Sequence, residues 1–260
     1  KANGHTVGYA LIFHCSVHPR TNYLYLMNVV SENLQLFFQQ KRFRSRSSSD
    51  IYESVFHAIL EHPDAPQQQY EDQLSYIPDL QNLAIDDDAD YVYICQNNTI
   101  YGTTIRELPN TKGKDLVSDV SSMFLSEPMD VSKYGVLWGG VQKNVGPAGV
   151  TIVVIRDDLI REDVLPGTPT MLRYKTHADA KSLYNTPPCY NIYVCGLVFK
   201  WLKEMGGLSV MKERNEQKAK ILSDYLDQSA MFRGTVAPKD RSLMNIPFIT
   251  GDADLDAKFI

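Results

Sequence analysis

The chain has 260 residues, enough for one large domain or two modest ones. With 43% hydrophobic and 22% charged residues, it has the composition of a folded globular protein. A formal net charge of −5 argues against a nucleic-acid-binding protein, which needs a basic surplus. No apolar run reaches the roughly 20 residues of a membrane-spanning helix, so we expect neither nucleic acid nor membrane as a partner.

The first 73 residues have the least regular pattern. Gly8–Phe13 is a candidate buried strand, and Tyr23–Gln40 and Ile51–Leu60 are candidate helices. Between these helices, Lys41–Asp50 is charged and serine-rich and is interpreted as a loop. We leave residues 1–73 unassigned and expect them to complete a large domain.

From about residue 74 the pattern predicts a sheet. Short β-rich runs occur at Tyr91–Cys95, Leu116–Val120 and Val136–Gly140. Val150–Ile155 is almost entirely β-branched, which is typical of a strand covered on both faces. Polar and Gly/Pro segments connect these runs, so we expect an α/β fold with a mostly parallel sheet.

Two helices and a strand follow. Pro188–Met205 and Leu208–Gln228 have helical spacing, with Pro187-Pro188 suited to the start of the first helix and Gly206-Gly207 to its end. Asn245–Thr250 is predicted to be a strand after a turn. The first helix carries one apolar stripe, which we interpret as core packing. The stripe consists of Tyr190, Tyr193, Val194, Leu197, Val198, Trp201 and Leu202.

The cysteines and histidines give no metal site. The spacing of the four cysteines fits neither a zinc site nor a disulfide framework, which favours reduced thiols in a cytoplasmic protein. His14 and His18 have no further ligand set around them. The cysteines are Cys15, Cys95, Cys189 and Cys195.

One glycine-rich loop carries a candidate catalytic residue. Lys143 lies within residues 139–149 (GGVQKNVGPAG), between two predicted strands. A lysine there can form a Schiff base with a carbonyl cofactor or bind phosphate as a point charge. Asp119 lies at the carboxyl end of an earlier predicted strand, and pairing such a lysine with an aspartate at the pyridine nitrogen suits pyridoxal phosphate. The residues alone leave a structural or surface role for Lys143 open.

A longer series of motifs, spanning residues 74–250, resembles the phosphoserine aminotransferases, a class V, fold-type I family of pyridoxal-phosphate enzymes. The series occurs in the family's order and includes YIPD (76–79), NTIYG (98–102), SDVSS (118–122), QKNVGPAG (142–149), SLYNTPP (182–188) and MNIPF (244–248). The resemblance implies a fold-type I large domain at 74–230 and, at 231–260, the truncated start of a smaller α+β domain.

The resemblance also implies an activity. It is amino transfer between L-glutamate and 3-phosphohydroxypyruvate, giving O-phospho-L-serine and 2-oxoglutarate in serine biosynthesis. By the same resemblance, Lys143 holds the cofactor and then moves the α-proton of the substrate, and Asp119 binds the pyridine nitrogen. The alternative for Asp119 is a cap of a helix or turn.

Four further residues resemble cofactor contacts of the family. Thr99 and Gln142 match a threonine near the cofactor and a contact on its phosphate side. Asn185 and Thr186 match a pair that reaches the phosphate in the neighbouring subunit, which implies a homodimer with shared sites. The alternatives are a loop hydroxyl for Thr99 and a simple helix start for Asn185-Thr186.

Several parts of the family's pattern have no counterpart here. Residues 1–73 lack its Ser-His-Arg string and its phosphate loop, and the two tryptophans, Trp138 and Trp201, stand at other motif positions. The family's C-terminal substrate arginines also lie beyond the last residue. The alternative function is therefore a non-catalytic or truncated protein of this fold that acts as a binding subunit. A third is a related enzyme acting on another amino acid.

Overall fold

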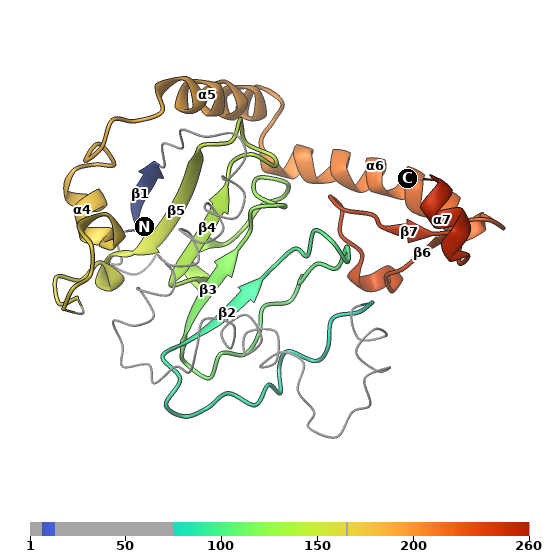
Figure 1. Cartoon of the computed structure of the whole chain (residues 1–260), viewed down its shortest axis with the longest axis horizontal. Coiled ribbons are helices and arrows are strands. Elements are labelled where there is room, and N and C mark those ends of the chain that lie inside the picture. Colours follow the sequence, from blue (N-terminus) through green and yellow to red (C-terminus); the bar gives the residue numbers. More distant parts are fainter. Residues whose placement is uncertain (1–6, 14–74, 165, 260) are drawn as a thin grey trace.

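The computed structural model describes residues 7–13, 75–164 and 166–259 (Figure 1). The described residues contain a five-stranded sheet with strand order β1-β5-β4-β3-β2. Its strands are β1 (Val7–Phe13), β2 (Tyr91–Cys95), β3 (Asp115–Asp119), β4 (Val136–Gly140) and β5 (Val150–Arg156). The five predicted strands are confirmed, each boundary lying within one residue of its expected place.

The strand directions confirm a mostly parallel sheet. β2, β3 and β4 pair in parallel, and β5 pairs antiparallel with both β4 and β1. β1 therefore runs in the same direction as β2, β3 and β4, and β5 alone among these five runs the opposite way.

Alternate residues of the strands build a core on each face of the sheet. On β3, Leu116 belongs to one buried cluster and Val117 to the other. On β5, Val150 lies on the first face, whereas Val153 and Ile155 lie on the second. The two-residue period of a strand sends neighbours to opposite faces, so this sheet is covered on both sides, as the β-branched run predicted.

The helices follow the sheet in the chain, and α4 packs beside β1 (Figure 1). In Figure 1, α5 runs across the top of the sheet, and α6 extends from it toward β6, β7 and α7. The helices are α4 (Tyr174–Asp179), α5 (Cys189–Glu204), α6 (Leu208–Gln228) and α7 (Ala253–Phe259). Short 3-10 helices occupy Val131–Lys133, Asp157–Leu159, Thr170–Leu172 and Pro238–Asp240.

The boundaries of α5 and α6 agree with the sequence prediction. Pro188 is the N-cap residue of α5, and Gly206, with φ 105°, follows its C-cap residue. The amide of Gly207 donates to Leu202 O at 2.9 Å. A positive φ at the end of a helix is a conformation that glycine adopts without strain, so the Gly-Gly pair ends α5 here.

The predicted core packing of the α5 stripe is wrong for four of its seven residues. Leu202 is buried, but Tyr190 (72% exposed), Tyr193 (63%), Leu197 (47%) and Trp201 (47%) face outward. The contact with the body of the domain is narrow because it centres on Cys195, whose Sγ lies close to Gly146. The apolar stripe is wider than that contact, so much of it forms an exposed apolar face.

The C-terminal residues form a small unit beside α6. β6 (Arg233–Gly234) pairs antiparallel with β7 (Phe248–Ile249), and the rings of Phe232, Phe248 and Phe259 pack edge to face. The predicted strand Asn245–Thr250 is thus only two residues long. Pro247 has no amide hydrogen to donate to a neighbouring strand, which explains the late start.

Some predictions fall outside the described residues. They are the helices at 23–40 and 51–60, the loop at 41–50, and the thiol of Cys15 and the imidazoles of His14 and His18. The domain boundaries at residues 73 and 230 stay predictions.

Candidate active site

The carboxyl ends of three parallel strands form one edge of the sheet. Cys95, the last residue of β2, stands in register with Asp119, the last residue of β3, and Asp119 stands in register with Trp138 of β4. Ligands of α/β sheets bind outside this edge. The loops that leave it carry Thr99 after β2, and Gln142 and Lys143 after β4.

Lys143 lies on a tight turn between β4 and β5. The turn is fixed at its base by Val141 and Val145, both fully buried, and the amides of Val145 and Gly146 donate to Val141 O at 3.0 and 2.9 Å. Lys143 is exposed between these anchors. The Asn144 side chain donates from Nδ2 to Phe124 O at 3.2 Å, which ties the turn to the loop after β3. The backbone under Lys143 is thus fixed while its amine stays accessible.

The carboxylate of Asp119 is held in one orientation by Ser121. Its Oδ1 accepts the Ser121 hydroxyl at 2.6 Å and the Ser121 amide at 2.8 Å. The Ser121 Oγ in turn accepts the amide of Gly140 at 3.0 Å, so the acid is linked to the end of β4, three residues before Lys143. Asp119 therefore does cap a turn, and within the described residues its Oδ2 receives no hydrogen bond. That oxygen can bind a ligand.

Burial and charge act in opposite directions on Asp119. Burial raises the pKa of the carboxyl above its usual value, and this effect outweighs the others. The hydroxyl and amide of Ser121 and the positive charge of Lys143 each lower that pKa. Lys143 is therefore close enough to Asp119 to interact with it electrostatically, as a pair acting on one cofactor requires.

The thiol of Cys95 is a neighbour of this acid. Burial, with the negative charge of Asp119 as the second cause, raises the pKa of Cys95 to about 12. The sulfur also donates to Asn97 O at 3.4 Å. A raised pKa lowers the thiolate fraction, so Cys95 is a weaker nucleophile than an ordinary cysteine.

Thr99 lies in an exposed turn after β2. Asn98 Oδ1 accepts the amides of Ile100 and Tyr101 at 3.1 and 3.0 Å, and the amide of Gly102 donates to Asn98 O at 2.9 Å. Asn98 thus shapes the turn, and Thr99 is presented at its surface.

The other predicted cofactor contacts are exposed. Gln142 immediately precedes Lys143, and its side-chain amide folds back over Gly140. Asn185 and Thr186 lie just before α5, where the Asn185 amide contacts the sulfur of Met171. Within the described residues, no hydrogen bond joins Asn185 or Thr186 to the pair Asp119 and Lys143. The chain by itself brings together the lysine and the acid, but not the pair before α5.

Sequence reasoning missed the roles of Ser121 and Asn97. Ser121 follows Asp119 by two residues. This spacing is typical of a turn in which the aspartate side chain accepts the backbone amide two residues on. Asn97 is 2% exposed, and its side chain contacts residues far along the chain. No local pattern indicates such contacts.

Of the described helices, none is long and apolar enough to cross a bilayer. In the same part of the chain, no three His, Cys, Asp or Glu side chains come together in a way that could hold a metal ion.

Comparison with protein families and sequences places the chain among known proteins. The family model "Aminotransferase class-V" matches residues 67–260. Phosphoserine aminotransferase of Lysinibacillus sphaericus is 47% identical over 191 residues, which cover 73% of this chain and 52% of the relative. The Haemophilus influenzae phosphoserine aminotransferase is 50% identical over 184 residues, covering 71% and 51%. The chain spans about half the length of the curated relatives it matches.

Solved structures agree with the sequence matches. Phosphoserine aminotransferase from Bacillus circulans subsp. alkalophilus superposes with a TM-score of 0.75 at 32% identity, covering 97% of this chain and 68% of that one. A PLP-bound phosphoserine aminotransferase from Trichomonas vaginalis gives 0.77 at 27% identity, covering 97% and 71%. The expected fold, that of the fold-type I transferases, is confirmed.

Proposed function

The chain belongs to the aminotransferase class-V family, and we propose that it is a phosphoserine aminotransferase. It transfers the amino group between L-glutamate and 3-phosphohydroxypyruvate, giving O-phospho-L-serine and 2-oxoglutarate. The observation that carries the proposal is the placement of Lys143 and Asp119 at one carboxyl edge of the parallel strands, with the Asp119 carboxylate oriented by Ser121. We place the reaction in the cytoplasm, where the free thiols Cys95, Cys189 and Cys195 stay reduced.

The residues of this edge fit pyridoxal phosphate. Ser121 occupies Asp119 Oδ1 with two hydrogen bonds, which leaves Oδ2 for the protonated nitrogen of a pyridine ring. Burial of the carboxyl strengthens its attraction for that cation, since the surroundings screen charge less than water does. The exposed amine of Lys143 stands on the next loop of the same edge. Gln142 lies beside Lys143 on that loop, and Thr99 lies on the loop after β2.

The chemistry divides between the cofactor and the chain. When bound, pyridoxal phosphate supplies an aldehyde that condenses with amines and a ring that accepts electrons. With the cofactor bound, Lys143 Nζ would hold it and, once displaced by the incoming amino acid, would accept the proton from the substrate α-carbon. The ionised form of Asp119 would keep the proton on the ring nitrogen. The Ser121–Gly140 link keeps acid and lysine in a fixed relative position.

We further propose that two copies complete each site. Asn185 and Thr186 are exposed and lie next to an apolar face of Leu183, Tyr184, Tyr190, Tyr193, Leu197 and Trp201, all more than a third exposed. An apolar face of this extent favours association. In a symmetric dimer the same face meets its equivalent, which would bring Asn185 and Thr186 to the partner subunit's cofactor phosphate.

The dimer has a direct test. Tyr193→Glu places a charge in the exposed apolar face and should convert a dimer, measured by light scattering, to a monomer with weaker cofactor binding. Ile221→Glu is the matched control, since Ile221 is exposed on α6, outside that face. A wild-type chain that is monomeric while fully loaded with cofactor would contradict shared sites.

The reaction is tested in two stages with purified protein. Pyridoxal phosphate should produce a visible absorbance band, and L-glutamate should then convert that band while 2-oxoglutarate accumulates in equal amount. Addition of 3-phosphohydroxypyruvate should restore the band and yield O-phospho-L-serine. No band in the intact protein would refute the cofactor assignment.

The same assay separates the alternatives. Cofactor binding without the glutamate step would favour a binding subunit of this fold over an enzyme. Turnover with other amino acids but not with O-phospho-L-serine, in a substrate panel, would favour a related aminotransferase.

A further inference from the structure

A buried asparagine at the carboxyl edge of the sheet lies at the centre of a polar network. Asn97 Nδ2 donates both of its hydrogens, to Ser122 Oγ at 2.7 Å and to Asn245 Oδ1 at 2.8 Å. Its Oδ1 accepts the hydroxyl of Ser242 at 2.5 Å. Asn97 (2% exposed), Ser122 (7%) and Ser242 (1%) are all buried. In this orientation the Nδ2 and Oδ1 atoms of Asn97 both have partners.

One arm of the network ends at the turn that carries Asp119. Ser122 returns a hydrogen bond to Asn97 O at 3.0 Å, so the two residues are joined twice. The neighbouring Gln96 amide donates to Asp119 O at 3.0 Å. Asn97 also opens the turn that presents Thr99. It therefore joins the two loops that carry proposed cofactor contacts.

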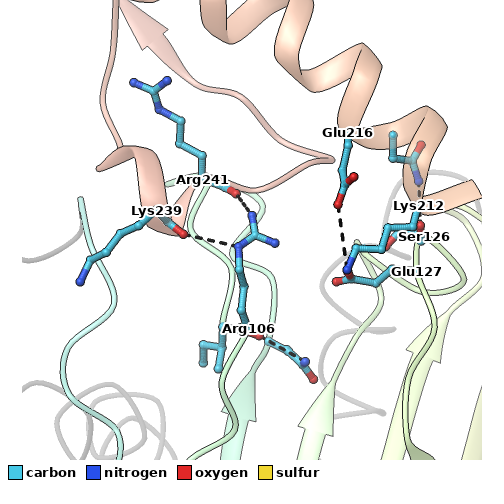
Figure 2. Close-up of polar contacts among 10 residues, drawn as sticks. Arg106, Ser126, Glu127, Lys212, Glu216, Lys239 and Arg241 are labelled. Carbon is cyan, nitrogen blue, oxygen red and sulfur yellow. Dashed lines mark hydrogen bonds and ion pairs between the residues drawn. The ribbon is translucent and has the colours of Figure 1, made fainter. Parts of the chain in front are cut away.

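The other arm ends in the C-terminal segment 239–245. Ser242 Oγ accepts the amides of Met244 and Asn245 at 3.0 and 3.1 Å, which shapes that segment around Asn97. Figure 2 shows how the segment is fastened: the Arg106 guanidinium donates to the carbonyls of Arg241 at 2.6 Å and Lys239 at 3.4 Å. The segment is therefore held along the loop after β2.

We propose that Asn97 is a positioning residue, through which the C-terminal segment fixes the Asp119 turn and the Thr99 loop. Removing its amide, or the Ser242 hydroxyl, leaves buried polar groups without partners, and the network must rearrange to satisfy them. The rearrangement reaches Ser122, and with it the turn in which Ser121 orients Asp119. The inference rests on the proposed function, because it assigns the two loops to cofactor binding.

The first test needs no cofactor. Hydrogen–deuterium exchange of the full chain compares wild type with Ser242→Ala and Asn97→Ala. Ser242 touches neither Asp119 nor Ser121, yet its substitution should accelerate amide exchange in residues 120–124 as well as in 242–247. Acceleration confined to 242–247 overturns the proposal. If Asn97→Ala does not fold, Ser242→Ala and Asn245→Ala give the same decision.

A matched control removes an equally buried amide elsewhere. Asn215 on α6 is 3% exposed and donates to Ser126 O at 2.9 Å, near the Lys212–Glu127 ion pair seen in Figure 2. Asn215→Ala should lower the melting temperature by an amount similar to Asn97→Ala. It should leave exchange at 242–247 unchanged, because its hydrogen bond lies outside the Asn97 network. Any acceleration should be confined to the residues around Ser126, whose amide donates to Met123 O at 2.9 Å.

The second test uses pyridoxal phosphate binding, followed by absorbance. Asn97→Ala and Ser242→Ala should each raise the dissociation constant roughly tenfold, equivalent to about 1.4 kcal/mol. The double variant should be no weaker than Asn97→Ala, because both changes break one network. Asn215→Ala should bind like wild type. If Ser242→Ala binds cofactor as tightly as wild type, the proposal is overturned. If the wild-type chain itself binds no cofactor, the proposed function is refuted, and the exchange test alone decides this inference.

Discussion

The hydroxyl of Ser121 offers a sharp test of how the chain controls its acid. Ser121→Ala removes the 2.6 Å hydrogen bond to Asp119 Oδ1 and the acceptor of the Gly140 amide, while the Ser121 amide at 2.8 Å remains. A hydrogen bond to a charged group contributes about 1.5–3 kcal/mol. Because Ser121 is only partly buried and water can replace some of the loss, we expect about 1.5 kcal/mol, or roughly tenfold weaker cofactor binding.

The pH dependence gives the substitution a signature. Burial raises the pKa of Asp119, and the Ser121 hydroxyl lowers it. Without the hydroxyl that pKa must rise further. Cofactor binding requires the ionised acid, so affinity increases as pH rises through the Asp119 pKa, and in Ser121→Ala this increase should occur at higher pH. Titration of the visible band from pH 5 to 9 at several cofactor concentrations measures both quantities.

The chain supplies its own control for this experiment. Ser132 donates its hydroxyl to Asp130 Oδ1 at 2.6 Å and its amide at 3.2 Å, with the same two-residue spacing but on the surface. There the hydroxyl is the largest cause of the shift in the Asp130 pKa. The net shift is downward because burial opposes it only weakly. Ser132→Ala should bind cofactor like wild type. Equal affinity and an equal pH profile in Ser121→Ala and wild type would refute the reasoning about Asp119.

Two further substitutions test the electrostatics and the packing of the site. Asp119→Asn should abolish tight cofactor binding yet raise the melting temperature of the cofactor-free protein at pH 8. The reason is that a buried acid with a raised pKa lowers the stability of the fold as pH rises through that pKa. The gain in melting temperature should shrink toward pH 4, where wild-type Asp119 is protonated. A lower melting temperature at pH 8 would contradict the assigned direction. Gly102→Ala should destabilise the protein by at least about 3 kcal/mol in denaturant titrations, since φ is 73° and the new Cβ would lie 2.2 Å from Pro247 Cδ. Gly113→Ala, at φ 83° with open space around it, should cost only about 1 kcal/mol, and equal losses would show that the Pro247 contact is unimportant.

The strands were predictable because both faces of the sheet are buried. Apolar and β-branched runs such as Val150–Ile155 have few other uses in a folded chain. The antiparallel direction of β5 was not predictable in this way. A strand between β1 and β4 needs the same kinds of buried residue whether it runs parallel or antiparallel to them. The partner of an element decides its direction, and that partner is not encoded locally.

The stripe on α5 shows a second limit of pattern reasoning. Spacing identifies an apolar face but not the surface that covers it. Here the contact around Cys195 and Leu202 is covered by the chain itself, and Tyr193 and Trp201 are exposed. The stripe that was predicted to be core is therefore largely exposed to solvent in the single chain.

The candidate site divides in the same way. Asp119 lies at the end of one predicted parallel strand and Lys143 just after another. Such strands bring their carboxyl ends to one edge, so the proximity of the two residues follows from the sequence. The orientation of the acid depends on the Gly140 amide reaching Ser121 from 19 residues away. The Asn97 network spans 145 residues to Ser242. Contacts of that range depend on the assembled fold.

The central claim is that the amine at position 143 holds the cofactor. The direct measurement is borohydride reduction of the full chain after incubation with pyridoxal phosphate, followed by peptide mass spectrometry. We predict one phosphopyridoxyl group per chain on the peptide containing Lys143, and none in Lys143→Ala. A label distributed over surface lysines, or attached to a different lysine in wild type, would contradict the account.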